Sequence, residues 1–297
     1  MRYLMTGQDY FYKTTPDRFD IWKCIFCGFE RIWPLPDEDK IKLFYPNNYY
    51  SFDLESSSFS RIKKKMASCY YDRSPPYFGR LAAKIFNHFL FLGLMLENRG
   101  NNNFLDVGCG DGHDVRLMEK FGWNSFGFEA GESNKNSTKR IITGRSLKDE
   151  DFGGIKFDYI RIWQVLEHIA DPDEMLDAVV RLMADGGKII IGVPNSSGLW
   201  AKIFGKFWFG RDVPRHLINF NDKNIKIILE KHKIRIEKMK YQSLNGFAGS
   251  LQNLVNGAWG KNVKIFDKRL VVVLLYPFEF ICNVLGISDA IVIIAKK

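Results

Sequence analysis

Three glycines alternate within the segment 104–114, whose sequence is FLDVGCGDGHD. They are Gly108, Gly110 and Gly112, and glycine lets the backbone adopt positive φ and approach a ligand closely. Where such a turn joins a strand to a helix, free N–H groups at the start of the helix point toward the ligand. The segment therefore predicts a nucleotide-type pocket.

The residues around these glycines restrict the ligand. Position 113 is His113, so the spacing is G-x-G-x-G and lacks the third glycine of a dinucleotide site. Asp106 precedes the first glycine by two residues, where a carboxylate repels a pyrophosphate and attracts a cationic group. Glu129 lies 21 residues after Gly108, at the end of the next expected strand, where a carboxylate can accept both hydroxyls of a ribose. The pattern indicates a ligand with a ribose and a cationic group but no diphosphate.

Short apolar runs alternate with segments of helical spacing throughout the second half of the chain. This alternation predicts an α/β fold of the Rossmann-like, doubly wound type, with helices on both faces of the sheet. Strands are expected at 103–108, 124–129, 157–163, 186–194, 234–242 and 289–297, and helices at 112–122, 132–142, 171–185 and 221–233. Asp171 should cap the third of these helices, and Gly186 and Gly187 should end it.

The first part of the chain differs in composition. Residues 1–60 are rich in aromatic residues, proline and aspartate, which predicts a small, loop-rich lobe. Residues 61–76 are basic and are expected to form an irregular linker, whereas 77–98 have helical spacing. The predicted organisation is therefore an N-terminal lobe and linker over 1–76 and a second domain over 77–297.

Charge and cysteine content narrow the partners and the cellular compartment expected for the protein. The formal net charge is +9, which suits either an anionic partner or a lysine-rich solvated surface. Five cysteines without a regular pattern favour a reducing cytoplasm over a disulfide framework, and the first residues do not resemble a signal peptide. Residues 270–286 form an apolar stretch broken by Pro277 and Glu279, which predicts a buried helix or hairpin or a peripheral membrane contact.

Taken together, these segments resemble the class I S-adenosylmethionine-dependent methyltransferases over residues 78–297. The resemblance rests on LDVGCGDG, GFE, FDYI…VLEHIADP, GGKIIIGVPN and DVPRHLINF, in this order. It implies a seven-stranded mixed sheet whose last strand is antiparallel, and S-adenosylmethionine as cofactor. CxxCG…PLP…YY and PRHL…F are similar to a subgroup associated with bacterial polysaccharide or small-molecule modification.

The resemblance also implies roles for individual residues. Asp106 and the backbone of Gly108, Cys109, Gly110 and Gly112 would hold the methionine end of the cofactor, and Glu129 would hold its ribose. The segment RSLKDEDF would lie beside the adenine, with Ser146 where many members have aspartate and Leu147 against the ring. Trp163 and Gln164 would line the cofactor near its methyl group.

Two histidines are candidates for the general base that an oxygen nucleophile needs. His168 follows the fourth expected strand, and His216 lies in PRHL; each has a structural role as its alternative. Arg215 would bind an anionic substrate or form a salt bridge. The sequence around Glu167 and His168 also resembles metal-binding strand ends of some quinone and RNA methyltransferases, but Gln164 replaces the first acid. No metal is therefore expected there.

Cys24 and Cys27 have the spacing of a zinc knuckle, but zinc takes four ligands and no earlier CxxC supplies the others. They are weak candidates for a degenerate zinc-ribbon-like site.

The acceptor is expected to be a small molecule or a glycan intermediate, methylated at oxygen. An RNA or protein methyltransferase and a non-catalytic protein that only binds the cofactor are the alternatives. Aromatic and basic residues alternate over 200–216, which suits a lid over the substrate or a nucleic-acid contact; the lid is favoured and no nucleic acid is expected. The sequence leaves the oligomeric state open.

Overall fold

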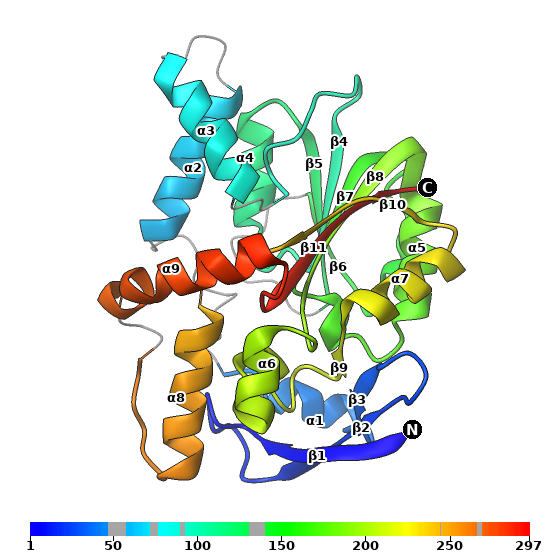
Figure 1. Cartoon of the computed structure of the whole chain (residues 1–297). Coiled ribbons are helices and arrows are strands. Elements are labelled where there is room, and N and C mark those ends of the chain that lie inside the picture. Colours follow the sequence, from blue (N-terminus) through cyan, green and yellow to red (C-terminus); the bar gives the residue numbers. More distant parts are fainter. Residues whose placement is uncertain (47–57, 72–76, 90–92, 131–139, 244, 266–268) are drawn as a thin grey trace.

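The computed structural model describes residues 1–46, 58–71, 77–89, 93–130, 140–243, 245–265 and 269–297 (Figure 1). Its centre is a seven-stranded sheet in the order β10-β11-β8-β7-β4-β5-β6. β11 is antiparallel to both neighbours, whereas β4, β5, β6, β7 and β8 run parallel. The strands are β4 (Asn103–Val107), β5 (Asn124–Glu129), β6 (Ile141–Thr143), β7 (Phe157–Trp163), β8 (Met183–Pro194), β10 (Arg235–Tyr241) and β11 (Ala290–Lys296). This confirms the predicted seven-stranded mixed sheet with an antiparallel last strand.

Two apolar layers cover the sheet because successive side chains of each strand point to opposite faces. On one face, α5 (Pro172–Leu182) and α7 (Asp222–Lys231) pack against the main core. On the other, Leu117 and Met118 of α4 (His113–Lys120) pack with Phe104, Tyr159 and Ile190. Figure 1 shows α5 and α7 to the right of the sheet and α4 to its left. The doubly wound arrangement is confirmed.

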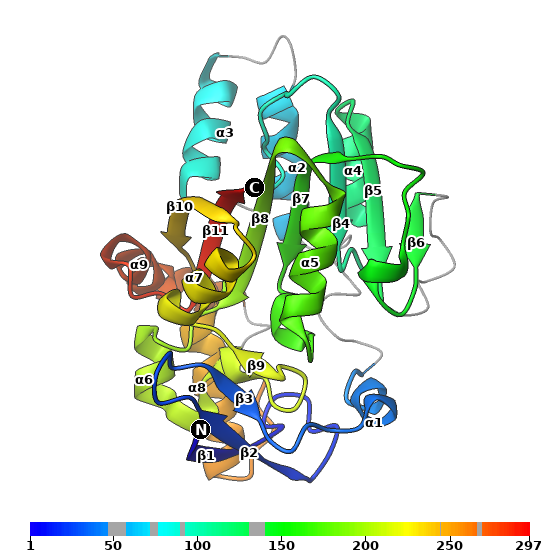
Figure 2. The ribbon, with the colours of Figure 1, turned by 90° about the vertical axis from the view of Figure 1, so that its right-hand side faces the viewer.

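A second, smaller sheet is built mainly from the N-terminal residues. Its order is β1-β2-β3-β9, with β1 (Arg2–Gln8), β2 (Arg18–Lys23) and β3 (Glu30–Ile32), followed by α1 (Glu38–Leu43). Its edge strand β9 (Ile218–Asn219) comes from the segment after β8, nearly two hundred residues later in the chain. Figure 2 shows this sheet below the seven-stranded sheet. The division into 1–76 and 77–297 stays a prediction, and β9 joins the two parts by backbone pairing.

Two expectations about helices are wrong. Residues 61–71 are not an irregular linker but belong to α2 (Ser58–Tyr71), because Lys63 and Ala67, one turn apart, are buried while the basic residues between them face solvent. Residues 72–76 lie outside the described part. α2 packs against α3 (Tyr77–Phe89).

Gly186 and Gly187 do not end a helix. α5 begins as predicted, with Asp171 capping Asp173 and Glu174, but it ends at Leu182 and both glycines lie inside β8. A Cβ atom on Gly187 would lie 2.8 Å from the carbonyl oxygen of Phe157, so close backbone approach explains this glycine. Of the helix expected over 132–142, residues 131–139 lie outside the described part, and Ile141 begins β6.

The segment between β8 and α7 folds over the end of the sheet. It contains α6 (Leu199–Phe204) and short helical turns at Gly205–Phe207 and Phe209–Arg211, and it packs against α8 (Gly246–Ala258). Trp208 is fully buried and Trp200 nearly so. Its tryptophans thus point inward, as expected of a packed lid. α9 (Arg269–Leu285) follows α8 and holds residues 270–285 of the apolar stretch on a single helix. Many of its apolar side chains are exposed, so the expectation of a buried helix or hairpin is wrong.

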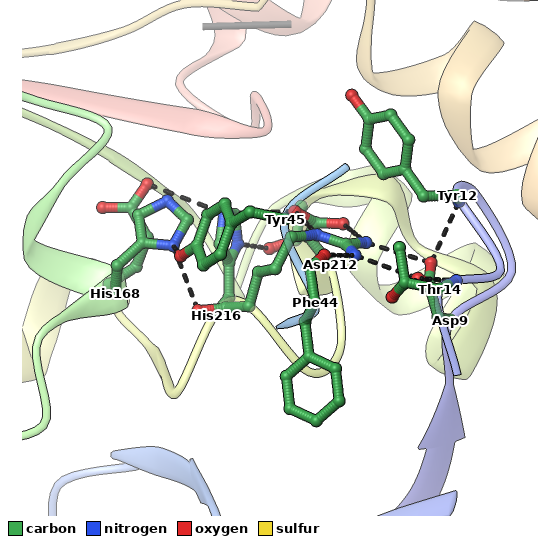
Figure 3. Close-up of polar contacts among 11 residues, drawn as sticks. Asp9, Tyr12, Thr14, Phe44, Tyr45, His168, Asp212 and His216 are labelled. Carbon is green, nitrogen blue, oxygen red and sulfur yellow. Dashed lines mark hydrogen bonds and ion pairs between the residues drawn. The ribbon is translucent and has the colours of Figure 1, made fainter. Parts of the chain in front are cut away.

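Arg215 fastens this lid to the N-terminal lobe (Figure 3). Its guanidinium is fully buried, and all five N–H groups donate: Nε and Nη2 to Asp212, Nη1 and Nη2 to Asp9, and Nη1 also to the carbonyl oxygen of Phe44, at 2.5–3.0 Å. Burial alone would raise the pKa of Asp9, but the hydrogen bonds and the charge of Arg215 lower it below its ordinary value. Arg215 therefore holds two segments together and does not face a substrate, which corrects the expectation from sequence.

Replacing this guanidinium should strongly destabilise the protein. Arg215→Met leaves two buried carboxylates without a cation, and breaking a buried pair in this way costs about 3–5 kcal/mol. Urea unfolding followed by circular dichroism measures the loss. Lys148→Met is the control, because Lys148 pairs with Glu174 at the surface, where loss of an ion pair changes stability little. Equal effects of both variants would contradict the role given to Arg215.

Candidate functional site

The glycine turn joins β4 to α4 at the end of the central strand. Gly108, Gly110 and Gly112 have φ of 72°, 57° and 76°, which confirms that the turn needs glycine. A Cβ atom on Gly108 would lie 2.2 Å from the side chain of Val165, and one on Gly112 would lie 2.1 Å from Ile141. The loop after β7 therefore lies directly against the turn. Gly112 offers no side-chain cap, and Asp111 Oδ1 accepts the N–H of His113 at 2.9 Å at the start of α4.

Glu129 ends β5 beside this turn. One carboxylate oxygen accepts the N–H of Gly110 at 2.6 Å, and burial raises the pKa of the carboxyl. Cys109 is buried between the turn and Gly127, where a Cβ atom would meet its sulfur at 2.6 Å. The structure thus brings together the turn and the acid that the sequence placed at one pocket.

Asp106 belongs to a buried charge network that sequence analysis missed. The register of β4 and β7 sets Arg161 opposite Asp106, and Arg161 Nη1 lies 3.1 Å from Asp106 and 2.9 Å from Asp114. Lys63 from α2 binds Asp114 as well, at 2.5 Å. Burial raises the pKa of Asp106 to about 6 even though Arg161 opposes the shift. A charged residue inside the apolar run FDYIRIW was the available signal for Arg161.

The second cluster forms where the loop after β7 meets the lid (Figure 3). Glu167 and His168 follow β7, and His216 comes from the lid, so that their ligand atoms all lie within 4.8 Å of one another. His216 Nδ1 donates to the carbonyl oxygen of Gly210 at 2.8 Å, and His168 Nδ1 lies 3.0 Å from that of Arg215. The structure therefore brings both predicted histidines together and adds Glu167, which was not predicted as a catalytic residue.

The polar atoms of this cluster are unusually poor in partners. Glu167 is fully buried, and neither of its oxygens has a hydrogen-bond partner among the described residues. His216 Nε2 also has none and lies 4.0 Å from Glu167 Oε1. Burial raises the pKa of Glu167 to about 8 and lowers that of His168 to about 3. Unpartnered buried acceptors are costly, so the cluster has the form of a site that awaits a donor or a cation.

Comparison with known proteins assigns the chain to a family. A family model described as "Methyltransferase domain" matches residues 77–236, which is more than half of the chain. The chain belongs to the methyltransferase domain family. The membership confirms the resemblance found in the sequence and identifies S-adenosylmethionine as the cofactor.

Individual relatives of this methyltransferase are more distant. It is 31% identical to a ubiquinone biosynthesis O-methyltransferase of Caulobacter sp. over 103 residues, which are 31% of this chain and 40% of that protein. A ubiquinone biosynthesis O-methyltransferase of Bartonella tribocorum is 26% identical over 44% of this chain and 62% of its own length. The chain thus spans about half the length of the curated relatives it matches. A methyltransferase structure from Archaeoglobus fulgidus covers 67% of this chain and 87% of its own, with 22% identity and a TM-score of 0.44.

The remaining predicted cofactor residues of the methyltransferase lie around the same sheet edge. Trp163 ends β7 and Gln164 follows it. Gln164 has a φ of 55°, a strained value for a residue with a side chain and typical of functional turns. Ser146 donates to Glu174 and begins a helical turn, Leu147–Asp149. Leu147 is fully buried in the main core, so its side chain presents no surface to an adenine ring.

The metal-binding question concerns two places in the methyltransferase. Glu167, His168 and His216 offer one carboxylate and two imidazoles, a donor set that fits a transition-metal ion better than magnesium. Hydrogen bonds from imidazole to backbone carbonyls, as made here, orient such ligands. Cys24 and Cys27 lie in a turn after β2, where backbone hydrogen bonds lower the pKa of Cys24. Among the described residues, no third ligand joins these two thiols, so the zinc site stays a prediction.

Glu167 should make the stability of the metal-free methyltransferase depend on pH. Its native pKa of about 8 lies above its ordinary value of 4.5, so the folded state binds the proton more tightly than the unfolded state. The free energy of unfolding should therefore fall as pH rises from about 5 to about 8. Glu167→Gln cannot ionise and should gain stability over the parent protein across that range, measured by urea unfolding in a chelator. Glu119→Gln, on α4, is the control; parallel curves for Glu167→Gln and the parent would refute the assignment.

Proposed function

We propose that this methyltransferase transfers the methyl group of S-adenosylmethionine to an oxygen atom of a small organic molecule. The observation that carries the proposal is a pair of buried polar groups that have no hydrogen-bond partner among the described residues. Glu167 lies on the loop that packs against the glycine turn, and His216 Nε2 comes from the lid. A hydroxyl group placed between cofactor and cluster would find both a methyl donor and a proton acceptor. Alignment of these three groups is the main source of rate in such a displacement.

The proposed cofactor site uses the residues at the ends of β4 and β5. Glu129 would bind the ribose hydroxyls, and the backbone of the glycine turn would hold the methionine end. Asp106 already pairs with Arg161, so its carboxylate attracts the cofactor's ammonium group less than a free one would. We therefore assign the larger share of cofactor affinity to Glu129 and keep Asp106 as a positioning residue for the turn.

The proposed reaction is an in-line displacement. A lone pair on the acceptor oxygen attacks the methyl carbon, and the carbon–sulfur bond breaks, leaving its electron pair on sulfur. The acceptor proton goes to His216 Nε2, which is free to receive it because Nδ1 donates to Gly210. The neutral thioether then leaves with the remainder of the cofactor. His168 lies against His216, with ring centroids 4.6 Å apart, and orients it.

A divalent metal would be held by Glu167, His168 and His216. When bound, it would lower the pKa of the acceptor hydroxyl. Elemental analysis of the purified protein decides between this arrangement and the metal-free one that the sequence predicts.

The relatives and the buried cluster support the acceptor class of this proposal. The relatives from Caulobacter and Bartonella are O-methyltransferases of ubiquinone biosynthesis, which favours an aromatic or otherwise apolar hydroxyl compound as acceptor. They give no support to the polysaccharide setting expected from sequence. A glycan, RNA or protein acceptor is a separate outcome of an acceptor screen, and salt-dependent RNA binding would identify the RNA case.

Glu129→Ala should weaken cofactor binding. Two charge-assisted hydrogen bonds to the ribose would be lost, which corresponds to a rise in Kd of about a hundredfold or more. Isothermal titration calorimetry with S-adenosylmethionine measures this change. Glu119→Ala, at the other end of α4, should leave the Kd unchanged. If the folded parent protein does not bind S-adenosylmethionine, the proposed function is wrong.

His216→Ala should lower kcat by about a hundredfold or more while the Kd for S-adenosylmethionine stays within about threefold. The measurement is methyl transfer to the best substrate from a panel of phenols and other small hydroxyl compounds. His232→Ala is the matched control, since His232 binds Asp173 and Asp177 near the surface. A protein that binds the cofactor but methylates no acceptor in the panel would favour the non-catalytic alternative.

A further inference from the structure

α9 carries its apolar side chains on the outside of the molecule. Seven of them are 53–70% exposed, and they recur at intervals of mostly three or four residues along one side of the helix: Leu270, Val273, Leu274, Phe278, Ile281, Val284 and Leu285. We call this surface the α9 stripe. Both views place α9 at the margin of the molecule (Figures 1 and 2). A contiguous stripe of this kind marks a surface that meets an apolar partner.

The orientation of α9 is fixed by polar contacts on its inner side. Glu279 is almost fully buried and accepts hydrogen bonds from Trp200 Nε1 at 3.1 Å and from the N–H of Phe247 at 2.8 Å. Asn283 bonds to both the N–H and the carbonyl oxygen of Ser243. Rotating α9 so that the α9 stripe faces inward would break all four hydrogen bonds and expose Glu279 and Asn283 to solvent. These hydrogen bonds therefore fix the α9 stripe on the outside of the molecule.

Basic residues occur toward both ends of α9. In the segment that leads into the helix, Lys261 and Lys264 are exposed, and residues 266–268 lie outside the described part. The other end of the helix packs near β10, where Lys238 and Lys240 alternate with Met239 and Tyr241. The latter two pack against the main core, so both lysines point to the sheet face on which α9 lies.

We propose that the α9 stripe lies in the interfacial layer of an anionic lipid bilayer. An apolar helix face flanked by positive charge is the combination that binds such surfaces. Among the described residues, no helix combines the length and apolarity needed to span a bilayer. In this proposal α9 lies along the surface, with its stripe toward the lipid. A second copy of the chain is a poorer occupant, because a two-fold pairing of α9 would set like charges against each other at both ends.

This inference does not depend on methyl transfer. It concerns only where the protein sits, and its test uses no activity measurement. The full-length protein is sedimented with vesicles of phosphatidylcholine alone and with vesicles of an equal mixture of phosphatidylcholine and phosphatidylglycerol. Binding should be stronger to the anionic vesicles by about tenfold or more and should weaken as salt is raised.

Leu274→Glu combined with Ile281→Glu places two charges in the middle of the α9 stripe and should reduce binding to anionic vesicles by about tenfold or more. Both side chains are already exposed, so the folded structure should persist, which thermal unfolding checks. Ile227→Glu, an exposed residue on α7 at the opposite face of the sheet, is the matched control and should leave vesicle binding unchanged.

Three outcomes would overturn the inference. The parent protein does not sediment with anionic vesicles, or the double variant binds them as well as the Ile227→Glu control does. In the third, size-exclusion chromatography with light scattering shows that the parent is a dimer and that the double variant is a monomer, which would assign the α9 stripe to a second copy of the chain.

Discussion

The buried guanidinium of Arg215 is the contact on which the arrangement of the site depends. Its side chain joins Asp9 of the N-terminal lobe to Asp212 of the lid, while its own backbone carbonyl accepts a hydrogen bond from His168. A single residue thus ties together the lobe, the lid and the loop after β7. A buried cation is tolerated only when it is fully paired, so these segments are held in one relative position or the pairing fails. The precise placement of His168 and His216 is a consequence of that constraint.

The features that depend on local sequence could be predicted. Glycine spacing and apolar runs are local, and they predicted the turn and the place of Glu129 beside it. They also predicted β4, β5, β7, β8, β10 and β11 along the chain, but not the short strand β6. The histidines could be singled out by type. What failed were local signals with two meanings. Glycine is common at helix ends, but Gly187 is required by a close backbone contact within β8. The basic run 61–71 forms a helix because one face of that helix is buried.

Other parts of the site depend on contacts between distant residues. Arg161 meets Asp106 only because of the register between β4 and β7, and Lys63 reaches Asp114 only because α2 packs above the glycine turn. Arg215 was correctly singled out as important, but its type alone does not tell whether its partner is a substrate or Asp9. Glu167 was seen only as part of a metal-type motif with one acid replaced. Glu167 is buried without a hydrogen-bond partner because of the way the lid packs over it, and the sequence of one segment does not show that packing.

The pairing of β9 with β3 has a consequence for the order of folding. The strands β1, β2 and β3 leave the ribosome before β9, and their sheet gains its fourth strand only when Ile218 and Asn219 have been made. Ribosomal synthesis proceeds at roughly 5–20 residues per second, so the unfinished edge of β3 waits on the order of ten seconds or more for its partner. During that time it is an open template for pairing with other chains. The small sheet is therefore begun early and completed late, and on the nascent chain its open edge is exposed to aggregation.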